Sequence, residues 1–84
     1  MIQIVFEGEK QRAAAYDGDK TVGRCRFVPS PEGWTITHTE TDPVYGGRGI
    51  AREMVLCVIR EADKAGVPLS ASCSFAKKVL EHTR

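Results

Sequence analysis

The 84-residue sequence lacks several features that would place it in a class at once. It has no apolar stretch near the roughly 20 residues that span a bilayer, so we expect no membrane-spanning helix. The formal net charge is only +1, and one tryptophan and two tyrosines offer few stacking platforms, so a nucleic-acid-binding module is disfavoured. The N-terminus "MIQIVFEGEK" alternates and then becomes charged, unlike a signal peptide.

Cysteines are few, and their spacing suggests no pairs. The three cysteines, Cys25, Cys57 and Cys73, are odd in number, lie far apart and include no CxxC pair. Neither a metal site nor a disulfide framework is therefore indicated. Reduced thiols are typical of the cytoplasm, and we expect the protein to be cytoplasmic.

The first half of the chain predicts an antiparallel meander of four strands. Apolar residues alternate with polar ones over residues 2–9, as in a half-buried strand. "DGD" at 17–19 and "PSPEG" at 29–33 supply the glycine and proline chemistry of tight turns. The segment 34–42 is rich in β-branched residues and predicts the fourth strand.

Alternation also assigns side chains to faces of these strands. It puts Val22 on the face opposite to Cys25, because the two are an odd number of positions apart. In the fourth strand it puts His38 and Glu40 on the face of Ile36, unless a bulge changes the phase.

The second half predicts two helices with a short strand between them. Apolar residues recur at helical spacing over 48–65, and Gly66 with a proline soon after ends that helix. "VPLSAS" follows as a short strand, and 74–84 predicts a last helix with Ser72 or Ser74 as its N-cap. The element order is β-β-β-β-α-β-α.

The loop "VYGGRGIA" at 44–51 has three glycines in four positions between a strand and a helix. Free backbone N–H groups and the helix dipole make such a corner suitable for an anion such as a diphosphate. The phosphate-binding patterns GxxxxGK[ST] and GxGxxG are both absent. The residues alone therefore leave an anion site and a flexible turn open, and Tyr45 and Arg48 either contact the ligand or lie in solvent.

The segment "HTETDPVYGGRGIAREMVLCVIREADKAGVPLSASCSFAKKVL" resembles the minimal, single-domain GCN5-related N-acetyltransferases. The shared features are a His-Thr strand before a proline, the glycine loop, a long helix and a Cys-Ser-Phe segment that opens the last helix. The resemblance covers residues 36–82, with departures at Gly46, where the family has Arg or Gln, and Ala71, where it often has proline. It implies one α+β domain over residues 1–84, an antiparallel meander followed by β-α-β-α, with helices flanking a mixed sheet.

The resemblance implies acetyl-CoA as the cofactor. Amides of the glycine loop would hold its pyrophosphate, and the end of the fourth strand would run beside its pantetheine arm. Lys77 would attract the 3′-phosphate or belong to a solvated charged face. The implied cofactor-binding residues are Thr41, Val44, Gly46, Gly47, Arg48, Gly49, Ile50, Ala51, Ser74 and Lys77.

Three residues are candidates for the chemistry. The start of a helix favours the thiolate of Cys73, which would accept the acetyl group transiently or only line the pocket; the alternative is a small buried residue. Histidine is a side chain suited to proton transfer near neutral pH, so His38 is a candidate general base, or else a satisfied, partly buried histidine. Glu40 is a second candidate base, or a solvated carboxylate.

The expected function is transfer of an acetyl group from acetyl-CoA to an amine on a small molecule or a protein. A backbone N–H of the fourth strand would polarise the thioester carbonyl. The alternative is a non-catalytic acyl-CoA sensor or interaction module. The chain is too short for the N-terminal helices of larger relatives, so we expect an open acceptor site that suits either function.

Overall fold

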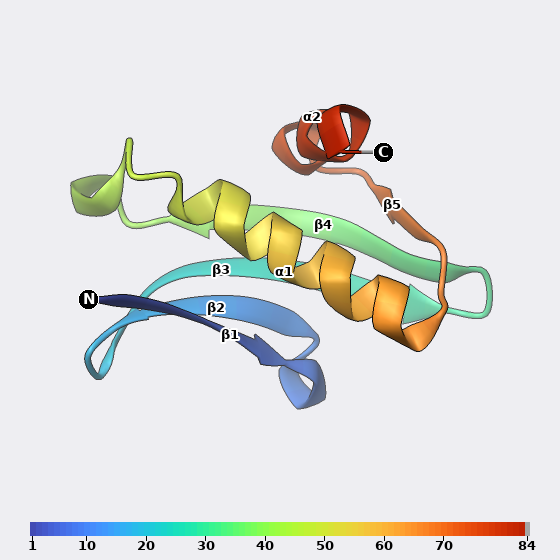
Figure 1. Cartoon of the computed structure of the whole chain (residues 1–84), viewed down its shortest axis with the longest axis horizontal. Helices are drawn as coiled ribbons and strands as arrows, with labels where there is room; N and C mark the ends of the chain where they lie inside the picture. Colours follow the sequence, from blue (N-terminus) through green and yellow to red (C-terminus); the bar gives the residue numbers. More distant parts are fainter. Residues whose placement is uncertain (84) are drawn as a thin grey trace.

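The computed structural model describes residues 1–83, which form a five-stranded sheet with two helices (Figure 1). The elements in chain order are β1 (Ile2–Glu7), η1 (Gly8–Lys10), β2 (Arg12–Asp17), β3 (Lys20–Ser30), β4 (Gly33–Thr41), η2 (Pro43–Tyr45), α1 (Ile50–Ala65), β5 (Leu69–Ala71) and α2 (Ser74–Thr83). The strands lie in sequence order; β1 to β4 pair antiparallel, and β5 runs parallel to β4. The predicted α+β class and mixed sheet are confirmed, while Arg84 at the end of the predicted last helix lies outside the described residues.

The first four strands form because the chain alternates and turns where the sequence predicts. Ile2, Ile4 and Phe6 of β1 pack against the core, whereas Gln3 and Val5 between them are exposed. The β2–β3 turn places Gly18 at a φ of 63°, a left-handed conformation that glycine adopts without a Cβ penalty.

Helix α1 covers one face of the sheet, as Figure 1 shows, and buries its apolar stripe there. The buried residues of α1 are Ile50, Met54, Val55, Cys57, Val58, Ile59 and Ala62. The helix starts two residues later than predicted, because Gly49 has a left-handed φ of 74° and so breaks helical geometry. The helix ends at Ala65 and is capped by Gly66, as predicted. The Gly66 N–H donates to the Ala62 carbonyl. None of the described helices is long and apolar enough to cross a membrane.

Two shifts in strand register alter the predicted faces. The β2–β3 pairing passes from Ala15↔Gly23 to Tyr16↔Thr21 and leaves Val22 as an extra residue, which is buried in the same core as Cys25. The prediction that Val22 lies opposite to Cys25 is therefore wrong.

The second shift lies in β4 and decides which side chains face the site. Arg26 pairs with His38 and Phe27 with Ile36, so Thr37 is unpaired. After this bulge Thr39 takes the core side, and His38 takes the opposite face. The sequence pattern did not decide whether this strand contains a bulge, and the structure shows that it does.

Strands β4 and β5 diverge soon after they meet. Their pairing covers only Trp34–Ile36 and Leu69–Ala71. The amides of Ser72 and Cys73 then both approach the Ile36 carbonyl, at 2.9 and 3.4 Å, and the chain turns into α2. Within the described chain, β4 beyond this point has no strand on that side. A cleft lies there, lined by Thr41 at the end of β4 and by Phe75 and Val79 of α2.

Candidate functional site

The glycine loop presents free backbone amides at the N-terminus of α1. Gly47 and Gly49 have φ values of 78° and 74°, and an added Cβ at either would meet no atom within 4 Å. The first intrahelical bond joins the Glu53 amide to the Gly49 carbonyl at 3.0 Å. The amides of the three preceding residues, 50–52, have no intrahelical partner, and Gly49 offers no capping side chain. The loop therefore combines unsatisfied donors, the positive end of the helix dipole and space for close approach.

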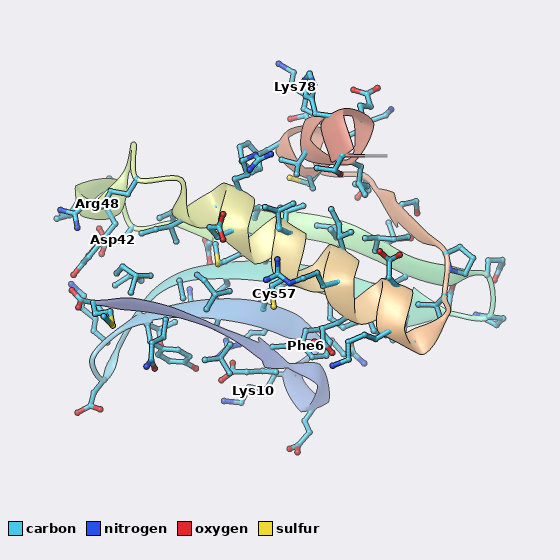
Figure 2. The ribbon with its side chains drawn as sticks, viewed as in Figure 1. Phe6, Lys10, Asp42, Arg48, Cys57 and Lys78 are labelled. Atoms are coloured by element: carbon cyan, nitrogen blue, oxygen red, sulfur yellow. The ribbon has the colours of Figure 1, made fainter. Side chains whose placement is uncertain are left out.

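Tyr45 ties this loop to the sheet. Its hydroxyl donates to Asp17 Oδ2 at 2.6 Å, a bond that lowers the pKa of Asp17 and raises the pKa of Tyr45. The Arg48 guanidinium lies 5.4 Å from the centre of the Tyr45 ring, within cation–π range. Figure 2 shows Arg48 and Asp42 at the same end of the molecule. Tyr45 is thus an anchor of the loop, and Arg48 packs on the anchor.

A cavity of about 320 Å³ joins the loop, the first turn of α1, the end of β4 and α2. Six of the ten predicted cofactor-binding residues line it: Thr41, Gly46, Gly47, Gly49, Ile50 and Ala51. The other four, Val44, Arg48, Ser74 and Lys77, are exposed and are not part of this lining.

The lining also contains Tyr45, for which the sequence left ligand contact and solvent open, and three residues that sequence reasoning missed: Arg52, Phe75 and Val79. Arg52 occupies the polar side of the helical pattern, and only the position of Gly49 as the N-cap places it in the first turn. Phe75 is 41% exposed, which is unusual for a large apolar side chain and is explained by its place on the cavity wall.

Thr41 carries a buried oxygen with an unused hydrogen-bonding capacity. Its Oγ1 is buried and has no hydrogen-bond partner among the described residues. Such orphaned polar atoms are rare in folded proteins. Since Thr41 lines the cavity, a ligand or water there would satisfy it.

Cys73 occupies the N-cap of α2, where the sequence predicted a serine. Its carbonyl accepts the Lys77 amide at 2.9 Å, the first bond of the helix. Ser72 lies before the cap, with its hydroxyl 3.5 Å from the Ile36 carbonyl, and Ser74 is the first helical residue. The predicted serine cap is therefore wrong, and the helix uses the thiol instead.

The surroundings of Cys73 favour its thiolate. Partial burial raises the pKa of the thiol, but hydrogen bonds from the Ala76 amide, the Thr39 hydroxyl, the Phe75 amide and the Thr39 amide together outweigh it. The pKa of Cys73 is therefore below its ordinary value, as expected at a helix N-terminus. Cys25, by contrast, is fully buried, and desolvation raises the pKa of its thiol to about 11.

The family model for the GCN5-related N-acetyl-transferase matches residues 12–84, which is most of the chain. This chain belongs to the GCN5-related N-acetyltransferase family. A search of curated proteins found no match to this family member.

Solved structures share the fold of this GCN5-related chain. A protein from Desulfovibrio desulfuricans described as a GNAT-family acetyltransferase has a TM-score of 0.66 at 19% identity, covering 71% of this chain and 41% of its own. An aminoglycoside acetyltransferase from an uncultured soil metagenomic sample has a TM-score of 0.66 at 13% identity, covering 87% and 55%. A transcriptional regulator from Bacillus halodurans has 0.59 at 27% identity, covering 71% and 45%. The chain thus spans about half the length of these structures.

The two candidate bases of this family member lie away from Cys73. His38 and Glu40 approach each other at 3.4 Å on the open face of the sheet, and the His38 side chain is 57% exposed. The interpretation of His38 as a partly buried residue is therefore wrong. Arg24 bonds Glu40 at 2.9 Å and, with His38, lowers the pKa of Glu40, which weakens it as a proton acceptor.

Proposed function

We propose that this chain is an acetyl-CoA-dependent N-acetyltransferase of the cytoplasm, acting on an amine of a small molecule or a protein. The observation that carries the proposal is the cleft between β4 and α2. One part is the cavity of free amides and the unpartnered Thr41 hydroxyl, and the thiol of Cys73 lies near the point where β4 and β5 part. An acyl donor with a phosphate at one end and a thioester at the other fits this order of groups.

The residues of the cavity suit such a donor. The amides of Ile50 and Ala51 and the open backbone at Gly47 and Gly49 would bind the pyrophosphate. Arg48 and Gly46 would flank it, and Thr41 and Val44 would run beside the pantetheine arm. Ser74 and Lys77, exposed in the first turn of α2, would meet the outer parts of the cofactor. Acetyl-CoA supplies an activated acetyl thioester when bound.

Cys73 supports transfer in two steps. Its sulfur forms a thioester bond to the acetyl carbon while the bond from that carbon to the donor's sulfur breaks, and the released thiolate takes a proton. An amine nitrogen then bonds to the acetyl carbon while the bond from that carbon to Cys73 Sγ breaks, and the proton that the nitrogen loses restores the Cys73 thiol. His38 and Glu40 lie 3.4 Å apart on the opposite face of β4, so we assign neither as the acceptor of that proton.

Release of CoA thiol and the intact mass of the protein test this function together. With acetyl-CoA alone we expect one added acetyl group, lost in Cys73→Ala and retained in the matched variant Cys57→Ala, since Cys57 belongs to α1 and is buried. Addition of accepting amines should remove the acetyl group and sustain thiol release. Turnover that survives Cys73→Ala would show direct transfer, and binding with no thiol release across amine and peptide panels would favour the acyl-CoA sensor.

A further inference from the structure

Thr39 lies between two cysteines that belong to different elements. Cys73 Sγ is 3.7 Å from Thr39 Oγ1, and Thr39 Oγ1 is 3.7 Å from Cys25 Sγ. The three side chains form a short chain of weak hydrogen bonds from the N-cap of α2, through β4, to β3. Cys25 and Thr39 are also direct partners in the β3–β4 register.

The bulge at Thr37 creates this arrangement. Without the extra residue, His38 would take the core side of β4, and Thr39 would point to the open face. With the bulge, Thr39 directs its hydroxyl toward Cys73. The Thr39 amide also points to Cys73, because β5 no longer pairs with β4 at this position. The same residue therefore contacts the sulfur through two groups, its hydroxyl and its amide.

The direction of these hydrogen bonds, from donor to acceptor, depends on the charge of Cys73. As a thiol, Cys73 donates to Thr39, and Thr39 donates to Cys25. Once Cys73 has lost its proton it can only accept, so the Thr39 hydroxyl must turn toward it. Cys25 stays protonated in its buried position, so its S–H is then free to donate to Thr39.

We propose that Thr39 is a positioning residue whose hydroxyl reverses between Cys25 and Cys73, and so holds the Cys73 sulfur in its ionised, nucleophilic form. This inference deepens the proposed function, on which its role in acetyl transfer rests. Cys25 is the buried donor at the far end of these hydrogen bonds, and it acts on Cys73 through Thr39.

The other ionisable groups around Cys73 leave this role to Thr39. On β4, His38 and Glu40 face the opposite side and pair with each other and with Arg24. On α2, the Lys77 side chain is exposed. On α1, the Cys57 thiol affects the pKa of Cys25 but is not among the groups that shift the pKa of Cys73. No charged side chain is among the described groups that shift Cys73.

The pH dependence of iodoacetamide alkylation at Cys73, followed by peptide mapping, tests the proposal without any cofactor. Thr39→Val should raise the midpoint pH of alkylation by about one unit, because a thiolate that loses a hydrogen bond is easier to protonate. Thr39→Ser keeps the hydroxyl and should restore the midpoint. Thr35→Val on the same strand, whose hydroxyl meets Ser70 at 3.1 Å, is the matched control and should change nothing.

Cys25→Ala gives a second test that does not depend on the folding of Thr39→Val. It should raise the midpoint in the same direction by a smaller amount, and Cys25→Ser, with a stronger donor, should not raise it. An unchanged midpoint in both Thr39→Val and Cys25→Ala, with native circular dichroism, would overturn the proposal. If the midpoints shift as expected while acetyl-CoA does not bind, the positioning role stands and the proposed function fails.

Discussion

Gly49 joins two roles in one residue. Its left-handed backbone starts α1, and its missing side chain leaves the amides of the next three residues open. A side chain with a Cβ would have room there but would be strained, since L-residues rarely adopt a φ of 74°. The same strain exists at Gly66, at the other end of the helix, with a φ of 70° and equally open space.

This pair of glycines allows a matched test of the proposed phosphate site. Gly49→Asp should weaken acetyl-CoA binding at least about 100-fold, because it adds a carboxylate where a phosphate must approach the amides. Gly66→Asp carries the same strain and charge away from the loop and should bind as wild type does. Isothermal titration of both variants checks this, and equal affinities would show that the phosphate site lies elsewhere.

At the scale of elements, the β1–β2 hairpin is joined by one carboxylate. Glu7 accepts from Tyr16 Oη at 2.6 Å and from Arg12 Nε at 2.7 Å, and all three residues are half-buried. The Tyr16 hydroxyl and then the Arg12 guanidinium hold the pKa of Glu7 below its ordinary value, against partial burial. A lowered pKa contributes stability above the unfolded value near 4.5, and this stability is lost as pH falls through the folded pKa.

Glu7→Gln should therefore destabilise the protein by about 1 kcal/mol at pH 7. The difference from wild type should shrink as pH falls below about 4.5, because the wild-type carboxylate then becomes protonated as well. Urea denaturation at several pH values measures both. Glu9→Gln, in the exposed turn that follows, is the control; a deficit in Glu7→Gln that persists unchanged at pH 3 would contradict the ion-pair account.

The order of elements could be predicted from the sequence because turn residues and hydrophobic periods mark it locally. "DGD", "AGVP" and the apolar stripe of α1 each act within a few residues. The bulges at Val22 and Thr37 could not, because alternation is the same on either side of an inserted residue until the partner strand fixes the register. The Thr39 contacts and the open-face pairing of His38 follow from that bulge.

The candidate site also has a part that the sequence predicts and a part that only the fold brings together. The glycine loop is visible in sequence since its chemistry lies in the backbone, and six predicted residues line the cavity. The Tyr45–Asp17 bond and the packing of Phe75 on the cavity join residues far apart in the chain. Only the folded chain brings these groups together.

At the scale of the whole molecule, α1 covers one face of a sheet whose opposite face exposes residues such as Val5, Arg26 and His38. The cleft between β4 and α2 brings the cavity beside the glycine loop and the Cys73 thiol to the same edge of β4. We propose that the glycine loop holds acetyl-CoA in this cleft.

Isothermal titration of the wild-type chain with acetyl-CoA tests that claim most directly. We expect one molecule bound per chain with a Kd between about 1 μM and 1 mM, the usual range for enzyme substrates. No detectable heat of binding at millimolar acetyl-CoA, from protein with native circular dichroism, would contradict it.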